Sequence, residues 1–226
     1  MRAIPFAPIL AASLMSTCLL LTPATTAAQG SRRWQEGAPT LRVWTYVTGA
    51  LEPVDRAAAR QIADDLLSSA GVAVEWRTCD APEACSRTTD PSPNVTLILS
   101  SAPRPACGTA ALERSGLSAT VLISVPCVTN VVLEVTHGPA GRSNPLLSTL
   151  QTPHLLGAAI AHELGHVLGL SHTPGGMMRA RLDMGGMLAL RRGELRFTRR
   201  EVAAMRASTM WQGLLAAKLA EPTLKP

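Results

Sequence analysis

The sequence predicts an α+β fold of α/β/α-like layering, in which a twisted mixed sheet with its helices precedes a small, mostly helical C-terminal lobe. Apolar or alternating runs rich in β-branched residues recur at residues 41–47, 72–76, 94–99 and 118–125, and an amphipathic helical pattern separates the first two. Beyond residue 150 the apolar periodicity is helical and is interrupted by one turn-rich segment. The length of 226 residues suits one domain, which can have two lobes.

The first strand–helix–strand unit is marked by the residues at its boundaries. Pro53 can begin a helix and Gly71 can end it, and the apolar face between them carries Val54, Ala58, Ile62 and Leu66. The run at 94–99 is nearly all apolar at its end, which predicts a central strand. The run at 131–135 is compatible with a fifth strand or with a short helix.

Two helices in the second half of the chain have recognisable N-termini. Thr152 is the expected N-cap of a long apolar helix, with Pro153 at its first position. Thr198 and Glu201 have the spacing of a capping box at the start of a last helix, which spans about residues 199–217. This last helix would form the C-terminal lobe.

Residues 1–28 have the pattern of a secretory signal peptide. Arg2 supplies the positive start, the apolar run at 9–21 is too short to span a bilayer, and small residues precede a cleavage site before Gln29. The alternative is a retained membrane anchor. We therefore expect a secreted or periplasmic protein with no stable membrane insertion after cleavage. Its parts are a flexible lead at 29–40, a folded domain at 41–218 and a tail at 219–226.

The charge of the chain is modestly basic and almost entirely due to arginine. Without Arg2 the 21 basic residues become 20 against 16 acidic residues, a net charge of +4. Arginines cluster between residues 191 and 200, where they indicate a solvated helix start or, alternatively, attraction to acidic substrates or a membrane surface. No aromatic-rich basic surface suggests a nucleic-acid partner, and we expect a monomer.

Four cysteines remain after removal of the signal peptide, and an even number in an exported chain indicates two disulfides. Three pairings are possible. We favour Cys79–Cys85 and Cys107–Cys127, because each pair brackets one turn-rich segment. A second metal site is the less favoured interpretation, since the spacings are irregular and no histidine is near in the sequence.

The strongest functional signal is the segment that contains His162, Glu163, His166, Gly169 and His172. The i, i+4 spacing places the first two histidines on one helix face, within reach of one metal ion. Gly169 can end the helix in a left-handed conformation, so that the chain turns and brings His172 to the same ion. Neutral imidazoles suit Zn²⁺, and three protein ligands leave a position for water, which is typical of catalytic zinc. Glu163 is close enough to contact that water without binding the metal.

This segment resembles the zinc-binding signature of the metzincin metalloproteases. The resemblance implies zinc bound by His162, His166 and His172, and it implies that Glu163 is the general base. It also implies a methionine turn beneath the metal, for which we favour Met178 in the turn-rich segment 173–178, with Met177 as the alternative.

The sequence departs from the metzincin pattern after this turn. Many metzincins have a tyrosine just after the methionine, but here Arg179 follows, and the only tyrosine in the chain is Tyr46. Arg179 or a backbone group would then have to stabilise the transition state. The resemblance covers about residues 153–180.

We therefore expect a metzincin-like zinc metalloendopeptidase whose active-site helix lies in the upper lobe. An extended peptide or protein substrate would pair with a sheet-edge strand at about 118–125. Two alternatives remain open. The first is a non-catalytic zinc module that binds peptides or a partner, and the second is a hydrolase that acts on a non-peptide amide.

Overall fold

The computed structural model describes residues 38–79, 93–137 and 144–220, all of which belong to the unit Trp34–Pro226. The predicted signal peptide, most of the lead and most of the tail lie outside the described residues. Among the described helices, none is both long enough and apolar enough to cross a lipid bilayer.

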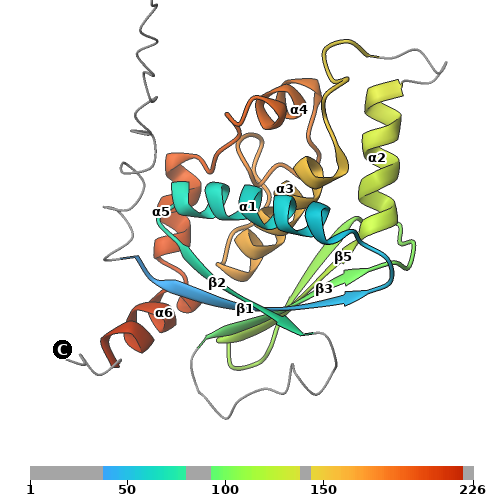
Figure 1. The fold of residues 1–226 in the computed structure, drawn as a ribbon. Helices are drawn as coiled ribbons and strands as arrows, with labels where there is room; N and C mark the ends of the chain where they lie inside the picture. Colours follow the sequence, from blue (N-terminus) through green and yellow to red (C-terminus); the bar gives the residue numbers. More distant parts are fainter. Residues whose placement is uncertain (1–37, 80–92, 138–143, 221–226) are drawn as a thin grey trace, which may run out of the picture. The chain divides into compact units, whose positions relative to one another are not determined.

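One sheet of five strands supports the helices of this unit (Figure 1). The strands lie in the order β2-β1-β3-β5-β4; β4 is antiparallel to β5, and the other neighbours are parallel. The predicted α+β fold with a mixed sheet is confirmed. The strand bounds are β1 Thr40–Thr48, β2 Ala73–Cys79, β3 Asn94–Ser100, β4 Gly108–Leu112 and β5 Ser118–Ser124.

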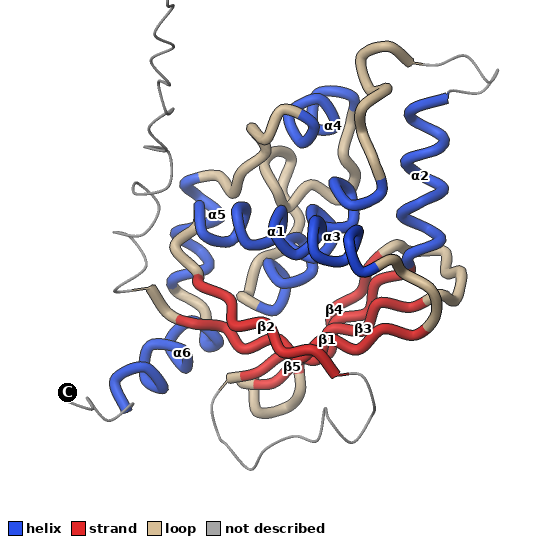
Figure 2. Tube along the Cα trace, in the orientation of Figure 1, coloured by secondary structure: helices blue, strands red, loops and turns tan. Residues whose placement is uncertain are grey.

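The helices α1 (Pro53–Ser69) and α3 (Thr152–Val167) lie over the same face of the sheet (Figure 2). Their close approach depends on Gly157 of α3, since a Cβ there would lie 2.6 Å from the carbonyl oxygen of Ala59. Eleven residues of α3 are buried. This packing holds α3 rigidly against the core, which matters because α3 carries the first two histidines.

The strand predicted at 118–125 differs from expectation in its place in the sheet. It is β5, which lies between β3 and β4, so the prediction that it forms the sheet edge is wrong. The edge strand next to β5 is β4, which has few β-forming residues and was not predicted; the other edge strand is β2. The run at 131–135 belongs to α2 (Val125–His137), so the helical alternative is the correct one.

The C-terminal lobe contains three described helices: α4 (Met184–Arg191), α5 (Arg199–Arg206) and α6 (Thr209–Ala220). The single helix predicted at 199–217 is therefore two helices. The break occurs because the Ser208 hydroxyl accepts a hydrogen bond from the Trp211 amide at 3.1 Å and so begins α6. Helix α4 was not predicted, and it begins where the Asp183 side chain accepts from the Gly186 amide at 2.8 Å.

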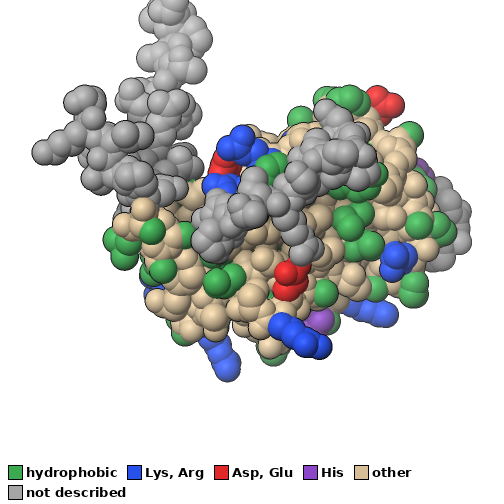
Figure 3. Space-filling view, turned by 90° about the horizontal axis from the view of Figure 1, so that it is seen from below, with side chains coloured by type: hydrophobic (Ala, Val, Ile, Leu, Met, Phe, Trp, Pro, Cys, Tyr) green, Lys and Arg blue, Asp and Glu red, His purple; other side chains and the backbone are tan. Residues whose placement is uncertain are grey.

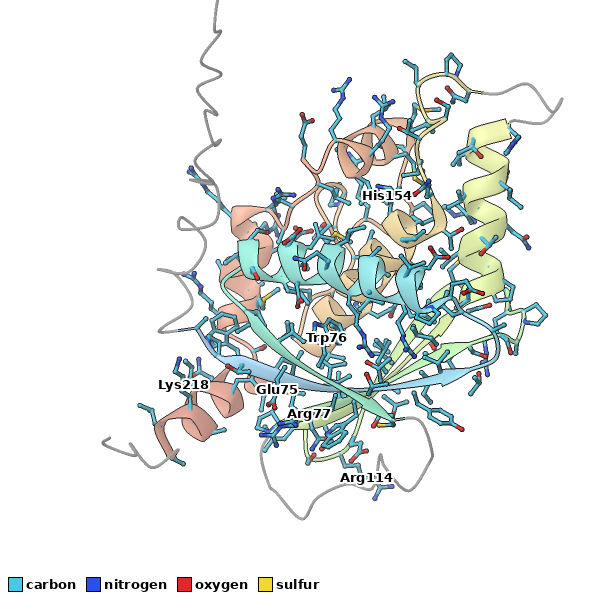
Figure 4. The ribbon with its side chains drawn as sticks, viewed as in Figure 1. Glu75, Trp76, Arg77, Arg114, His154 and Lys218 are labelled. Carbon is cyan, nitrogen blue, oxygen red and sulfur yellow. A yellow bond between two sulfur atoms is a disulfide. The ribbon has the colours of Figure 1, made fainter. Side chains whose placement is uncertain are left out.

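The edge strand β2 has different surroundings on its two faces (Figure 4). Trp76 faces α1 and donates its indole N–H to Asp64 at 2.8 Å, whereas Glu75 and Arg77 form an ion pair on the opposite face. Seen from below, the visible Lys and Arg side chains are spread out and do not gather into one patch (Figure 3). The basic excess of the sequence is therefore not concentrated on the visible part of this face.

Candidate metal site

The end of α3 has the geometry that the glycine in the motif predicts. Gly169 has φ +85°; its amide donates to the His166 carbonyl, and the Leu170 amide donates to the Gly165 carbonyl, both at 3.0 Å. These two bonds form a Schellman motif. A Cβ on Gly169 would also lie 2.6 Å from Ser208 Cβ, so the turn fits closely against the junction of α5 and α6.

The start of α3 lies one residue earlier than predicted. Gln151 is the N-cap, so Thr152 is already helical and Pro153 occupies the second position. The Gln151 amide donates to Nδ1 of His154 at 3.2 Å. His154 thus takes part in the cap of α3 and is not part of the cluster formed by the three histidines of the motif.

The three histidines of the motif converge on one point. Nε2 of His172 lies 3.3 Å from Nε2 of His162 and 3.2 Å from Nε2 of His166. His162 and His166 are half-buried, whereas His172 is exposed, so the cluster is open to solvent on one side. Among the described residues it is the only such cluster of His, Cys, Asp and Glu.

Backbone carbonyls fix the orientation of two of these rings. Nδ1 of His162 donates to the Met177 carbonyl at 3.0 Å, and Nδ1 of His166 donates to the Leu170 carbonyl at 2.7 Å. Because a carbonyl can only accept, the proton of each neutral ring is on Nδ1 and a lone pair is on Nε2. Burial, followed by the neighbouring histidines, lowers the pKa of His162 and favours this neutral form.

This arrangement fits a tetrahedral metal ion. A single proton on Nε2 of His172 could bridge only one of the two contacts, at 3.3 Å to His162 or at 3.2 Å to His166, whereas a cation among the three nitrogens satisfies all of them. Two nitrogens that are each about 2.0–2.1 Å from one tetrahedral zinc ion would be about 3.3–3.4 Å apart. The donor set, its protonation and its spacing therefore all suit a His₃ metal site.

The turn after His172 packs against α3, the helix that carries two of the histidines. Met178 is fully buried, and a Cβ on Gly165 of α3 would lie 2.5 Å from its sulfur. Gly165 thus leaves room for the Met178 thioether against α3. Met177 is also buried, and its contribution to the site is the carbonyl that accepts from His162.

Glu163 lies beside the histidines and is almost buried, with 8% of its surface exposed. Burial raises the pKa of its carboxyl to about 7. The backbone of Gly108, the first residue of β4, lies against this side chain: a Cβ there would be 2.7 Å from Cγ and 2.8 Å from Cδ of Glu163. The edge strand therefore begins at the candidate base.

A disulfide holds this end of β4. Cys107 is bonded to Cys127 of α2, as predicted, and the Cys107 carbonyl accepts from the Ser124 amide at 2.8 Å. Cys79 is also disulfide-bonded. Because Cys85 lies outside the described residues, the Cys79–Cys85 pairing stays a prediction.

Two charged residues that follow the turn, Arg179 and Asp183, do not join the cluster. The guanidinium of Arg179, which could have replaced the missing tyrosine, is ion-paired with Asp183. Asp183 itself caps α4 and is not a metal ligand in this geometry.

Two residues next to the site were not identified from the sequence as parts of it. Gly108 could have been noticed as a glycine that follows a disulfide cysteine. Glu201 was recognised only as a helix cap, yet its carboxylate also accepts from the Met178 amide at 3.0 Å. Nothing local in the sequence indicates that second contact.

Comparisons with known proteins give low similarity. No protein-family model and no curated protein matches the sequence. Archaemetzincin from Methanopyrus kandleri is similar in structure at 15% identity and a TM-score of 0.40, over 80% of this chain and 97% of that chain. Metalloproteinase-II from Bacteroides fragilis is similar at 14% identity and a TM-score of 0.44, over 74% of this chain and 52% of that chain. Similarity at this level does not bear on the chemistry of this chain, which rests on the geometry of the site.

Proposed function

We propose that this chain is an exported, zinc-dependent metalloendopeptidase of the metzincin kind. The observation that carries the proposal is the convergence of three imidazole Nε2 atoms beside a buried carboxylate. Two of the rings are oriented by carbonyls, so the ligand set is organised before metal binds. Such preorganisation is typical of a metal site and has no other evident use on a half-exposed surface.

His162, His166 and His172 would hold the metal. A zinc ion there would supply a Lewis acid that polarises the scissile carbonyl and lowers the pKa of bound water to about 7. The exposed side of the cluster, at His172, leaves room for water and substrate.

Glu163 is the proposed general base. A carboxyl whose pKa is raised by burial to about 7 accepts a proton far more readily than a solvated one, which suits proton transfer near neutral pH. Glu163 takes a proton from the attacking water and delivers it to the leaving amine. The backbone of Gly108 lies against the Glu163 side chain and so limits the positions that the carboxyl can occupy.

The edge strand β4 is the proposed docking site for the substrate backbone. Its inner side pairs with β5, and its outer side is the edge of the sheet. An extended peptide can add to such an edge by main-chain hydrogen bonds. Because β4 begins against Glu163, a peptide bound along it would place a bond near the proposed base. This role belongs to β4 and not to the strand at 118–124.

Export is proposed from the signal-peptide pattern at residues 1–28. The disulfide between Cys107 and Cys127 is consistent with an oxidising compartment. The mature protein would then encounter peptides or proteins outside the cytoplasm, as a secreted or periplasmic enzyme.

The test is a cleavage assay of the mature chain, residues 29–226, on a broad library of fluorescence-quenched peptides. We expect cleavage that a zinc chelator abolishes and added zinc restores. Glu163→Gln should retain zinc and lose activity by about 10²–10⁴-fold, whereas Glu134→Gln, at an exposed position of α2, should match the wild type. A wild-type chain that binds zinc but cleaves no peptide would favour the binding-module alternative. Full activity in Glu163→Gln would exclude Glu163 as the base.

A further inference from the structure

The carboxylate of Glu201 contacts both the N-terminus of its own helix, α5, and the loop that follows His172. Glu201 is on α5 and is 1% exposed. Its Oε2 accepts from the Thr198 amide at 2.6 Å, which completes the predicted capping box. Its Oε1 accepts from the Met178 amide at 3.0 Å and lies 2.6 Å from the Thr173 hydroxyl, which shares its one proton between this oxygen and the Gly175 carbonyl, also at 2.6 Å. A helix cap requires only the first of these three bonds.

The loop between His172 and α4 is shaped to receive this carboxylate. Gly176 has φ +74°, and a Cβ there would lie 2.5 Å from both Oε2 of Glu201 and Cγ2 of Thr198. The Thr173 amide also donates to the Met178 carbonyl at 2.9 Å, which closes residues 173–178 into a loop. Glu201 therefore fills the space that this loop encloses against α5.

Each end of the loop is connected to a proposed metal ligand, one through the chain and the other through a hydrogen bond. Thr173 follows His172 in the chain, so its bond to Glu201 limits where His172 can lie. Met178 follows Met177, whose carbonyl orients the ring of His162 at 3.0 Å. One buried carboxylate thus acts on two of the three histidines, each time through a neighbouring residue.

We propose that Glu201 is a positioning residue of the metal site and that it couples metal affinity to the docking of α5. Glu201 is not a member of the cluster of proposed ligands and would act on it through Thr173 and Met178. The proposal rests on the metal site put forward above but not on peptide hydrolysis. A carboxylate is required because both of its oxygens accept hydrogen bonds, whereas an amide offers one acceptor oxygen and one NH₂ donor.

Glu201→Gln is therefore the diagnostic substitution, since it preserves size but cannot accept all three bonds. The metal-free wild type and variant are titrated with Co²⁺ in competition with a chromophoric chelator. We expect the dissociation constant to rise by about 10–100-fold, as for other residues that orient metal ligands. The visible absorption bands of bound Co²⁺ should also change, because the His162 and His172 rings are less well oriented. The matched control is Glu194→Gln, an exposed residue of the same lobe, which should leave both readouts unchanged.

Thr173→Val tests the role of the loop contacts separately from the role of Glu201 in the helix cap of α5. It removes the hydroxyl shared between Oε1 of Glu201 and the Gly175 carbonyl, both of which hold the loop, and leaves the bond between Thr198 and Glu201 intact. We expect weaker Co²⁺ binding with an unchanged helix content, and this variant decides the question if Glu201→Gln does not fold. Unchanged Co²⁺ affinity and spectrum in the folded variants would overturn the positioning role. That result is independent of hydrolysis, because a wild type that binds Co²⁺ but cleaves no peptide contradicts only the proposed enzymatic function.

Discussion

Gly108 of the edge strand β4 lies in contact with Glu163 of α3, so closely that a single methyl group on Gly108 would reach within 2.7 Å of Glu163 Cγ. This contact joins the edge of the sheet to the proposed base. It also means that the position of β4 and the position of the carboxyl cannot change independently. The disulfide at Cys107, one residue earlier, attaches this end of β4 to α2.

Gly108→Ala should impair turnover without removing the metal. The new methyl group would displace the Glu163 carboxyl, and a misplacement of about 1 Å can lower the rate by roughly 10²-fold. The measurement is kcat on a cleaved peptide together with the zinc content. Gly185→Ala in α4 is the control, because a Cβ there meets nothing closer than 3.4 Å. Wild-type kcat in Gly108→Ala would show that the contact has no role in catalysis.

His172→Ala should weaken zinc binding strongly, because it leaves two histidine ligands on α3 and opens the site further to water. Zinc content after dialysis and competition with a chelator measure this loss. His137→Ala removes an exposed histidine outside the cluster and should bind zinc as the wild type does. Equally tight binding in His172→Ala would mean that another group completes the ligand set.

Glu163→Gln should stabilise the metal-free protein at alkaline pH. The carboxyl has a pKa of about 7 in the folded state and about 4.5 when unfolded, so the folded state holds its proton more tightly. Its contribution to stability is therefore full below pH 4.5, is lost as the pH rises to about 7, and is then constant. Above pH 7 the neutral amide should raise the free energy of unfolding relative to the wild type, with an upper limit of about 3 kcal/mol set by the difference between the two pKa values.

Urea unfolding of the metal-free wild type and Glu163→Gln at pH 4.5 and pH 8 provides this comparison. The stability difference between the two proteins should be larger at pH 8. An identical difference at both values would mean that the Glu163 carboxyl is not desolvated. The metal-free form is required because a bound cation would itself shift the pKa of a neighbouring carboxyl.

Loss of the Cys107–Cys127 disulfide should affect both stability and turnover. The bond closes a loop of 20 residues, for which the expected contribution is about 3 kcal/mol. The double variant Cys107→Ala with Cys127→Ala should unfold at lower urea concentration. If the disulfide also holds Gly108 against Glu163, kcat should fall while the zinc content is retained, whereas a purely global role would leave kcat of the folded fraction unchanged.

The sequence by itself determined the parts of this protein that depend on local spacing. The i, i+4 separation of His162 and His166 places both on one face of any α-helix, and Gly169 can adopt the positive φ that ends the helix before His172. The Thr198–Glu201 capping box is local for the same reason. The disulfide between Cys107 and Cys127 could be predicted because both residues flank one short segment.

Tertiary structure decided the features in which distant segments meet. Residues 108–112 have weak strand propensity and form β4 because β5 offers unpaired backbone groups to them. The contact of Gly108 with Glu163 and the contact of Glu201 with Met178 join residues 55 and 23 positions apart. Such contacts depend on how helices and sheet pack, and packing is set by the summed burial of many apolar side chains. No short pattern in the sequence encodes that sum.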